Sequence, residues 1–142
     1  MKKTLTFVLA TLALALAISA PAAAETPLLT ADIPFSFTAG GKVLPAGEYT
    51  VQYAASGAAV IIRAVEHRAS LVLMTYRSTD GAAERNDARL TFNRYGDSYF
   101  LSQIWDGYAP SANVVFRTRT ENELSRTASV QSFEVLAFLA RR

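Results

Sequence analysis

Apolar and polar side chains alternate along much of the chain with a period of two, which is typical of half-buried β-strands. Residues 33–37 and 49–53 show this alternation most clearly, with aromatic or branched apolar side chains on one face. Residues 60–65 and 70–77 carry large apolar side chains on both faces, so we expect these two strands in the middle of a sheet. Glycine, proline and serine separate the segments at intervals of roughly ten residues and favour turns there.

The stretch LTFNRYGDSYFLSQIW, residues 90–105, predicts the clearest hairpin of the chain, with its Gly-Asp pair at the turn. The length of the loop decides which side chains of the second strand face the core. A three-residue loop would place Phe100 and Ile104 beside the apolar face of the first strand. A two-residue loop would place Tyr99 and Leu101 there. We favour the three-residue loop because it gathers more apolar surface on one side.

The last third of the chain predicts one short helix and a final strand. Thr120 is expected to cap a helix from Glu121 to about Thr127. Phe133–Leu139 is expected to form a closing strand, although its apolar run also fits a helix by periodicity alone. The whole pattern predicts an all-β fold, either an antiparallel β-sandwich or a small β-barrel, with about seven to nine strands and one short helix near the C-terminus.

The first 24 residues have the composition of a secretory signal peptide: two lysines, an apolar run and an Ala-x-Ala pattern. The apolar run is shorter than the roughly 20 residues that span a bilayer. We therefore expect cleavage of residues 1–24 and export of a single β-domain, residues 25–142. The mature protein is expected in the periplasm or outside the cell, with no transmembrane segment.

Cleavage would also change the charge balance. Two of the 14 basic residues would leave, so 14 − 2 = 12 would remain against 12 acidic residues. A near-neutral chain gives no support to nucleic-acid binding, which depends on clustered cations. The chain contains no cysteine, which excludes thiol catalysis and cysteine-ligated zinc and leaves stability to the core.

Two segments resemble a family of small secreted β-domain proteins of soil bacteria. They are ADIPFSFTAGGKVLPAGEYTV near the mature start and LTFNRYGDSYFLSQIW in the middle. The first is similar to the family's IPF-F…LPAGEYTV opening, and the second to its F-RYGD-YFL hairpin. The resemblance covers most of the mature chain and implies an exported all-β domain. It implies no known activity, so it transfers no catalytic residue to this chain.

The histidine offers little catalytic chemistry. His67 is the only histidine, and its charged neighbours Glu66 and Arg68 indicate an exposed turn between strands. A catalytic zinc site usually has several histidine ligands, and a serine-hydrolase triad needs a G-x-S-x-G or similar context. The sequence has neither pattern.

The carboxylates also favour structural roles. Asp80, Glu84 and Asp87 lie in one polar loop, and the arginines among them favour a solvated loop over a calcium site. Asp97 and Asp106 flank a predicted strand that would hold them ~25 Å apart. A glycosidase pair needs roughly 5 to 9.5 Å. We therefore predict no catalytic residue, no metal ligand and no cofactor.

Aromatic residues at and after the predicted hairpin remain as candidates for ligand binding. They are Tyr95, Tyr99, Trp105 and Tyr108. Aromatic side chains with a polar tip can stack on sugars and also anchor partner proteins. The alternative is that Phe100 and Phe92 fill the core while the tyrosines cover a sheet edge.

These features predict an exported, non-enzymatic β-domain that binds or scaffolds a component of the cell envelope, either polysaccharide or protein. A hydrolase that acts on polysaccharide through an unrecognised carboxylate site is the competing hypothesis. A small outer-membrane barrel is the third hypothesis. The strands with two apolar faces also leave room for a homodimer.

Overall fold

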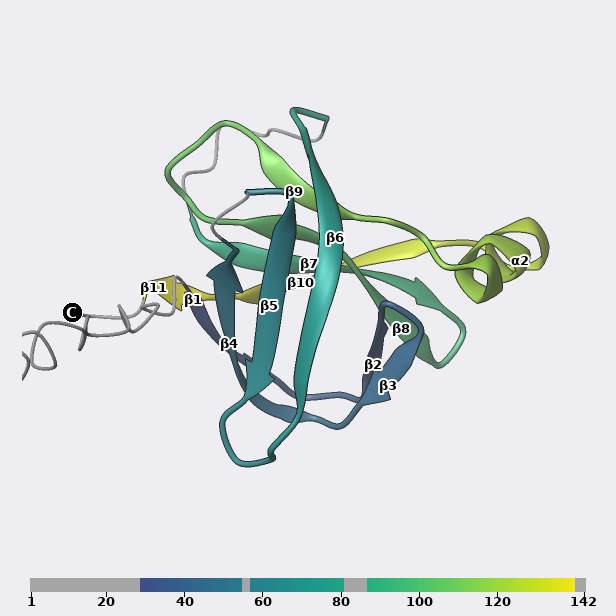
Figure 1. The fold of residues 1–142 in the computed structure, drawn as a ribbon. Coiled ribbons are helices and arrows are strands. Elements are labelled where there is room, and N and C mark those ends of the chain that lie inside the picture. Colours follow the sequence, from purple (N-terminus) through teal and green to yellow (C-terminus); the bar gives the residue numbers. More distant parts are fainter. Residues whose placement is uncertain (1–28, 55–56, 81–86, 140–142) are drawn as a thin grey trace, which may run out of the picture.

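The computed structural model describes residues 29–54, 57–80 and 87–139 (Figure 1). The expected signal peptide lies outside the described residues. The described part is made of strands and a single short helix, so the predicted all-β fold is confirmed. The elements are β1 (Leu29–Ile33), β2 (Phe37–Ala39), β3 (Lys42–Leu44), β4 (Gly47–Tyr53), β5 (Ala59–Ala64), β6 (Ser70–Ser78), β7 (Arg89–Tyr95), β8 (Ser98–Trp105), β9 (Ala112–Val115), α2 (Arg119–Thr127), β10 (Gln131–Leu136) and β11 (Phe138–Leu139).

The strands form one hydrogen-bonded path in the order β10-β7-β8-β9-β6-β5-β4-β1-β11, with β2 paired to β3 and β8. The sheet has 11 strands, nine on this path plus β2 and β3. It exceeds the expected number because it includes pieces of two or three residues, β2, β3 and β11. β10 and β11 form the two ends of the path, yet Ala137 alone separates them on the chain. The two end strands of the path are therefore consecutive along the chain.

Two layers of this sheet cross each other, with β4, β5 and β6 in front of β7, β8 and β10 in Figure 1. β6 belongs to both layers, because Ser70–Met74 pair with β5 and Thr75–Ser78 pair with β9. The segment of β10 and β11 likewise pairs first with β7 and then with β1. Strands that pass from one layer to the other at the corners are typical of orthogonal sheet packing.

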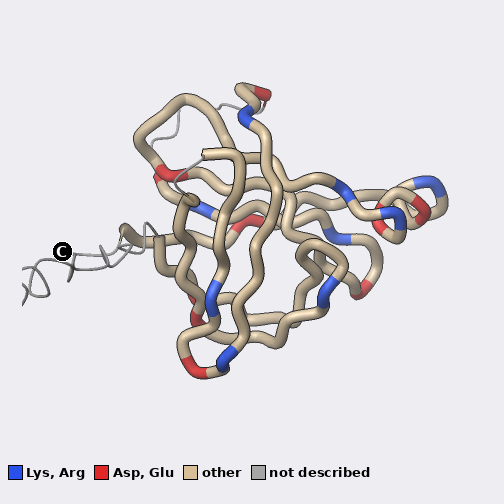
Figure 2. Tube along the Cα trace, viewed as in Figure 1, with Lys and Arg blue, Asp and Glu red and all other residues tan. Residues whose placement is uncertain are grey.

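The core fills the space between the layers. The largest fully buried side chains come from both layers and include Phe37, Tyr49, Phe92 and Ile104. The Phe37 ring meets Tyr49 and Phe92 edge to face, at centroid distances of 5.2 and 5.4 Å, a geometry that aromatic quadrupoles favour. Charged residues lie mainly in turns, at strand ends and on α2 (Figure 2). Burial of apolar surface is therefore the main stabilising contribution in this cysteine-free chain.

The β7–β8 hairpin corrects the predicted loop length. Tyr95 pairs directly with Ser98, so the loop has two residues, and Gly96 has a positive φ of 61° that favours glycine. As a result Leu101, not Phe100, lies opposite Phe92. The three-residue loop was wrong because the conformation of the turn sets the register here.

A β-bulge then restores part of the predicted pairing. The register shifts between Thr91 and Phe92, with Ser102 as the extra residue on β8, and beyond it Ile104 lies opposite Leu90. Leu101 and Ile104 are three residues apart, so a regular strand would turn one of them away from the core. The bulge lets both face inward, and both are buried in the core.

The predicted C-terminal helix and final strand are both confirmed, but the residue that caps the helix differs from the prediction. The helix begins at Arg119, and its cap is Thr118 rather than Thr120. Thr118 Oγ1 accepts a hydrogen bond of 3.2 Å from the Glu121 backbone N–H. Thr118 is extended and therefore suited to the cap position. Phe133–Leu139 forms strands, as predicted, and in the described part of the chain no helix is long and apolar enough to cross a membrane.

Candidate functional site

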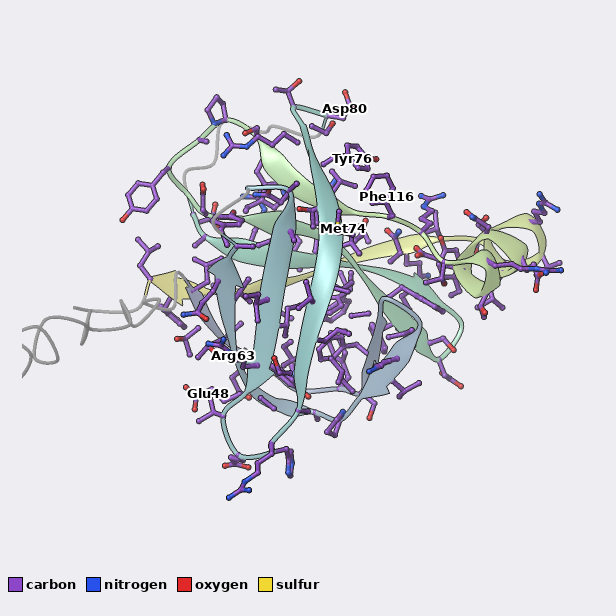
Figure 3. The ribbon with its side chains drawn as sticks, viewed as in Figure 1. Glu48, Arg63, Met74, Tyr76, Asp80 and Phe116 are labelled. Carbon is purple, nitrogen blue, oxygen red and sulfur yellow. The ribbon has the colours of Figure 1, made fainter. Side chains whose placement is uncertain are left out.

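The outward face of β6 carries a row of exposed apolar side chains, which we call the β6 row: Val72, Met74 and Tyr76. Their exposed fractions are 60, 61 and 48%. They lie two residues apart and so share one face, while Leu73 and Thr75 between them are buried. Phe116, which follows β9, is 56% exposed, and its ring centre is 5.0 Å from that of Tyr76. Figure 3 shows Met74, Tyr76 and Phe116 on this face.

A cleft of about 470 Å³ is lined in part by Tyr76 and Phe116, and we call it the β6–β9 cleft. The end of β6, the bulge of β8, the end of β9 and the helix α2 all contribute to its wall. The polar side chains used below are Ser78, Asp80, Gln103, Arg117 and Asn122. The cleft is therefore lined by two aromatic rings and by several hydrogen-bonding groups.

The helix wall of this cleft is held by a buried carboxylate. Glu121 is the buried residue of the otherwise largely exposed helix α2. Its Oε1 accepts a hydrogen bond of 2.9 Å from Asn93 Nδ2 on β7. Arg117 Nε lies 3.9 Å from the same oxygen. Glu121 thus fixes the start of α2 against the hairpin and thereby helps to place Arg117 and Asn122 at the cleft.

The same carboxylate lies near the hydroxyl of Tyr95. Burial raises the pKa of Tyr95, and the negative charge of Glu121 raises it further, while Arg117 acts in the opposite direction. The Tyr95 ring also packs edge to face on Phe100 at 5.8 Å. Tyr95 and Phe100 thus form a small second cluster beneath the start of α2, apart from the main core.

A single hydrogen bond connects the cleft to the only tryptophan. Trp105 is buried, and its Nε1–H donates to Gln103 Oε1 at 3.2 Å. The Arg89 guanidinium lies 4.4 Å from the centre of the ring, in a cation–π contact. A ligand that displaces the Gln103 side chain would therefore change the environment of the indole.

The four aromatic residues predicted as ligand-binding candidates lie in different environments. Tyr95 and Trp105 are buried, and Tyr99 is half-buried and stacked on Phe35 at 3.9 Å. Tyr108 is 75% exposed in the loop after β8. Buried rings offer no face to a ligand, so Tyr99 and Tyr108 keep the larger accessible surface. Ligand binding by these four residues stays a prediction.

The sequence did not single out Tyr76 and Phe116. Tyr76 lies in the segment 70–77, whose apolar residues on both faces predict burial on both sides. The exposure of Tyr76 and Phe116 depends on which strands and helices cover the sheet. The two-residue spacing of Val72, Met74 and Tyr76 identifies the shared face but does not show that it is exposed.

The other candidate groups lie in turns. His67 is exposed in the turn between β5 and β6, as predicted. Asp97 is exposed at the hairpin, 3.9 Å from Arg94, and Asp106 Oδ1 accepts hydrogen bonds from the backbone N–H groups of two following residues, as expected of a turn former. Glu84 lies outside the described residues, and no three metal-ligating side chains come together within the described ranges.

No family model, curated protein or solved structure matches this chain. The resemblance to the secreted β-domain proteins of soil bacteria stays a prediction.

Proposed function

We propose that the protein is an exported, non-enzymatic binding domain that holds a hydroxyl-rich ligand, such as a polysaccharide chain of the cell envelope, in the β6–β9 cleft. The observation that carries this proposal is the exposed pair of Tyr76 and Phe116 in the lining of a polar cleft. Two large rings in contact with water favour association with another surface, because their apolar faces stay unburied in the free domain.

The ring pair suits the C–H faces of sugars. The faces of aromatic rings carry negative charge density, and the C–H bonds of a pyranose are weakly positive. The two rings are tilted by 49° to each other, so a bent chain fits them better than a flat aromatic ligand. Tyr76 adds a hydroxyl that can donate to or accept from a sugar hydroxyl.

The cleft wall supplies partners for the remaining hydroxyls. The amides of Gln103 and Asn122 each offer donors and an acceptor, and Ser78 offers a hydroxyl that does both. Asp80 and Arg117 add one acceptor group and one donor group of opposite charge. Such a set recognises a neutral polar ligand without a net electrostatic attraction.

Binding explains this chemistry better than hydrolysis does. A glycosidase places two carboxyl groups about 5 to 9.5 Å apart across the scissile bond. Asp80 is the carboxylate among the described residues that line the cleft. Glu121 lies close by in the chain, but it is buried and bonded to Asn93.

Trp105 provides the test. The protein is titrated with xylohexaose, cellohexaose and chitohexaose up to about 10 mM, a range that detects weak binding, while tryptophan emission is recorded. We expect a saturable change with at least one of the three glycans, and no shorter products after incubation. Tyr76→Ala and Phe116→Ala should each weaken that binding about tenfold, the equivalent of 1.4 kcal/mol.

The matched control is Tyr108→Ala, which removes another exposed ring outside the cleft lining. It should leave the affinity unchanged. Equal losses in all three variants, or no response to any glycan, would contradict the proposal. Release of shorter glycans would support the hydrolase hypothesis.

A further inference from the structure

The β6 row has a pattern that is nearly the same in both directions along the strand. The outward positions are Ser70, Val72, Met74, Tyr76 and Ser78. Met74 is the middle residue of β6, with an apolar and then a polar side chain on each side of it. A surface with this pattern is complementary to a second copy of itself turned end to end.

Arg63 and Asp80, at the two ends of the row, have opposite charges, and Arg117 shares the cleft lining with Asp80. Arg63, on β5, lies directly opposite Ser70 and is exposed, whereas Asp80 is exposed just beyond Ser78. Figure 3 shows Arg63 and Asp80 at opposite ends of this face. Arg63 donates one hydrogen bond to Gln52, and a guanidinium has further N–H groups to offer. Glu48 lies at the same end as Arg63 but on β4, two strands from β6.

We propose that a second copy of this chain covers the β6 row, related to the first by a two-fold axis that passes at Met74 and runs across β6. The two β6 strands are then antiparallel, so Val72 of each copy meets Tyr76 of the other and the two Met74 side chains meet on the axis. Arg63 of each copy faces Asp80 of the other. An axis along β6 would instead bring the two Asp80 carboxylates together, which like-charge repulsion disfavours.

This dimer goes beyond the proposed ligand binding, and it shares Tyr76 with the cleft. A glycan in the cleft and the second copy therefore compete for the same ring. Because coupling between two binding events is reciprocal, the glycan shifts the protein towards monomer, and dilution raises the apparent glycan affinity. Met74 does not line the cleft, so a substitution there separates the two effects.

Sedimentation velocity tests the dimer on protein expressed from the full sequence. At about 100 µM, a concentration that populates weak dimers by mass action, we expect a dimer that dissociates on dilution. Met74→Glu and Val72→Asp should each give a monomer, because both put a charge into an apolar contact. Both side chains are exposed, and circular dichroism confirms that each variant keeps its fold.

A charge exchange tests the orientation. Arg63→Asp alone and Asp80→Arg alone should each weaken the dimer about tenfold, and the double variant should recover it, since the reversed pair attracts again. Glu48→Arg is the matched control and should leave the dimer unchanged. A monomeric wild type at every concentration, a Met74→Glu dimer, or a double variant that stays monomeric would overturn the proposal. Loss of glycan binding in Met74→Glu would count against the proposed function instead.

Discussion

The buried carboxylate of Glu121 offers the sharpest test of how the helix wall of the cleft is held. Glu121→Ala removes the acceptor that Asn93 Nδ2 uses at 2.9 Å and the charge that Arg117 faces at 3.9 Å. The start of α2 then has no buried anchor among its described residues. We expect the helix to detach from β7 more readily and the whole domain to lose stability.

The expected loss follows from the two contacts. A hydrogen bond to a charged group contributes about 1.5–3 kcal/mol. The Arg117 contact adds roughly 0.2–1 kcal/mol at most, because that side chain is half exposed and solvent screens it. The free energy of unfolding should therefore fall by about 2–3 kcal/mol. For a domain of this size that corresponds to a Tm lower by roughly 8 °C.

Thermal unfolding followed by circular dichroism measures this change. Glu121→Gln keeps an acceptor for Asn93 and should lose about half as much. Glu123→Ala is the control: its ion pair with Arg119 at 3.0 Å is exposed on both sides, so the cost should stay within about 0.5 kcal/mol. If Glu121→Ala destabilised the domain no more than Glu123→Ala, the buried anchor would have no energetic role.

Three further outcomes are expected. Thr118→Ala should cost about 1 kcal/mol of unfolding free energy in chemical denaturation, because it removes the cap, whereas Thr120→Ala should be neutral. Gly96→Ala should cost about 1 kcal/mol in the same assay, since alanine strains a φ of 61°. Burial first, and then the charge of Asp106, raises the pKa of Tyr53 to about 12, so the folded state holds its proton where the unfolded state has lost it. The contribution of Tyr53 to the free energy of unfolding should be fully present below pH 10 and should be lost between about pH 10 and 12. In urea titrations across this range, Tyr53→Phe should make the decrease in the free energy of unfolding smaller.

The sequence predicted the strands well because alternation is a local signal. The segment 49–53 lies in β4 with Tyr49 in the core, as its apolar face predicts. The strand predicted at 33–37 was wrong, because β1 ends at Ile33 and β2 begins only at Phe37. Pro34, which has no N–H to donate, follows the end of β1. The position of the helix was also predictable, because a capping hydroxyl and an early acidic residue precede a polar segment. Thr118 and Thr120 are both able to cap, and pattern alone does not decide which one is extended.

Features that depend on how one segment packs against another could not be predicted from the sequence. The bulge at Ser102 exists because Leu101 and Ile104 both have to reach the core while Gly96 fixes the register at the turn. The exposure of Tyr76 and Phe116 depends on the absence of a covering layer over the described outer face of β6 and β9. The sequence pattern of a short apolar strand is the same whether its second face contacts protein, a ligand or water.

The binding surface itself is tested most directly by two-dimensional ¹⁵N NMR during titration with the glycan that changes Trp105 emission. The account predicts that shifted amide signals cluster at Ser78, Gln103, Phe116 and Asn122, around the cleft. Shifts centred instead on the loop of Tyr108, or scattered evenly over the domain, would contradict it.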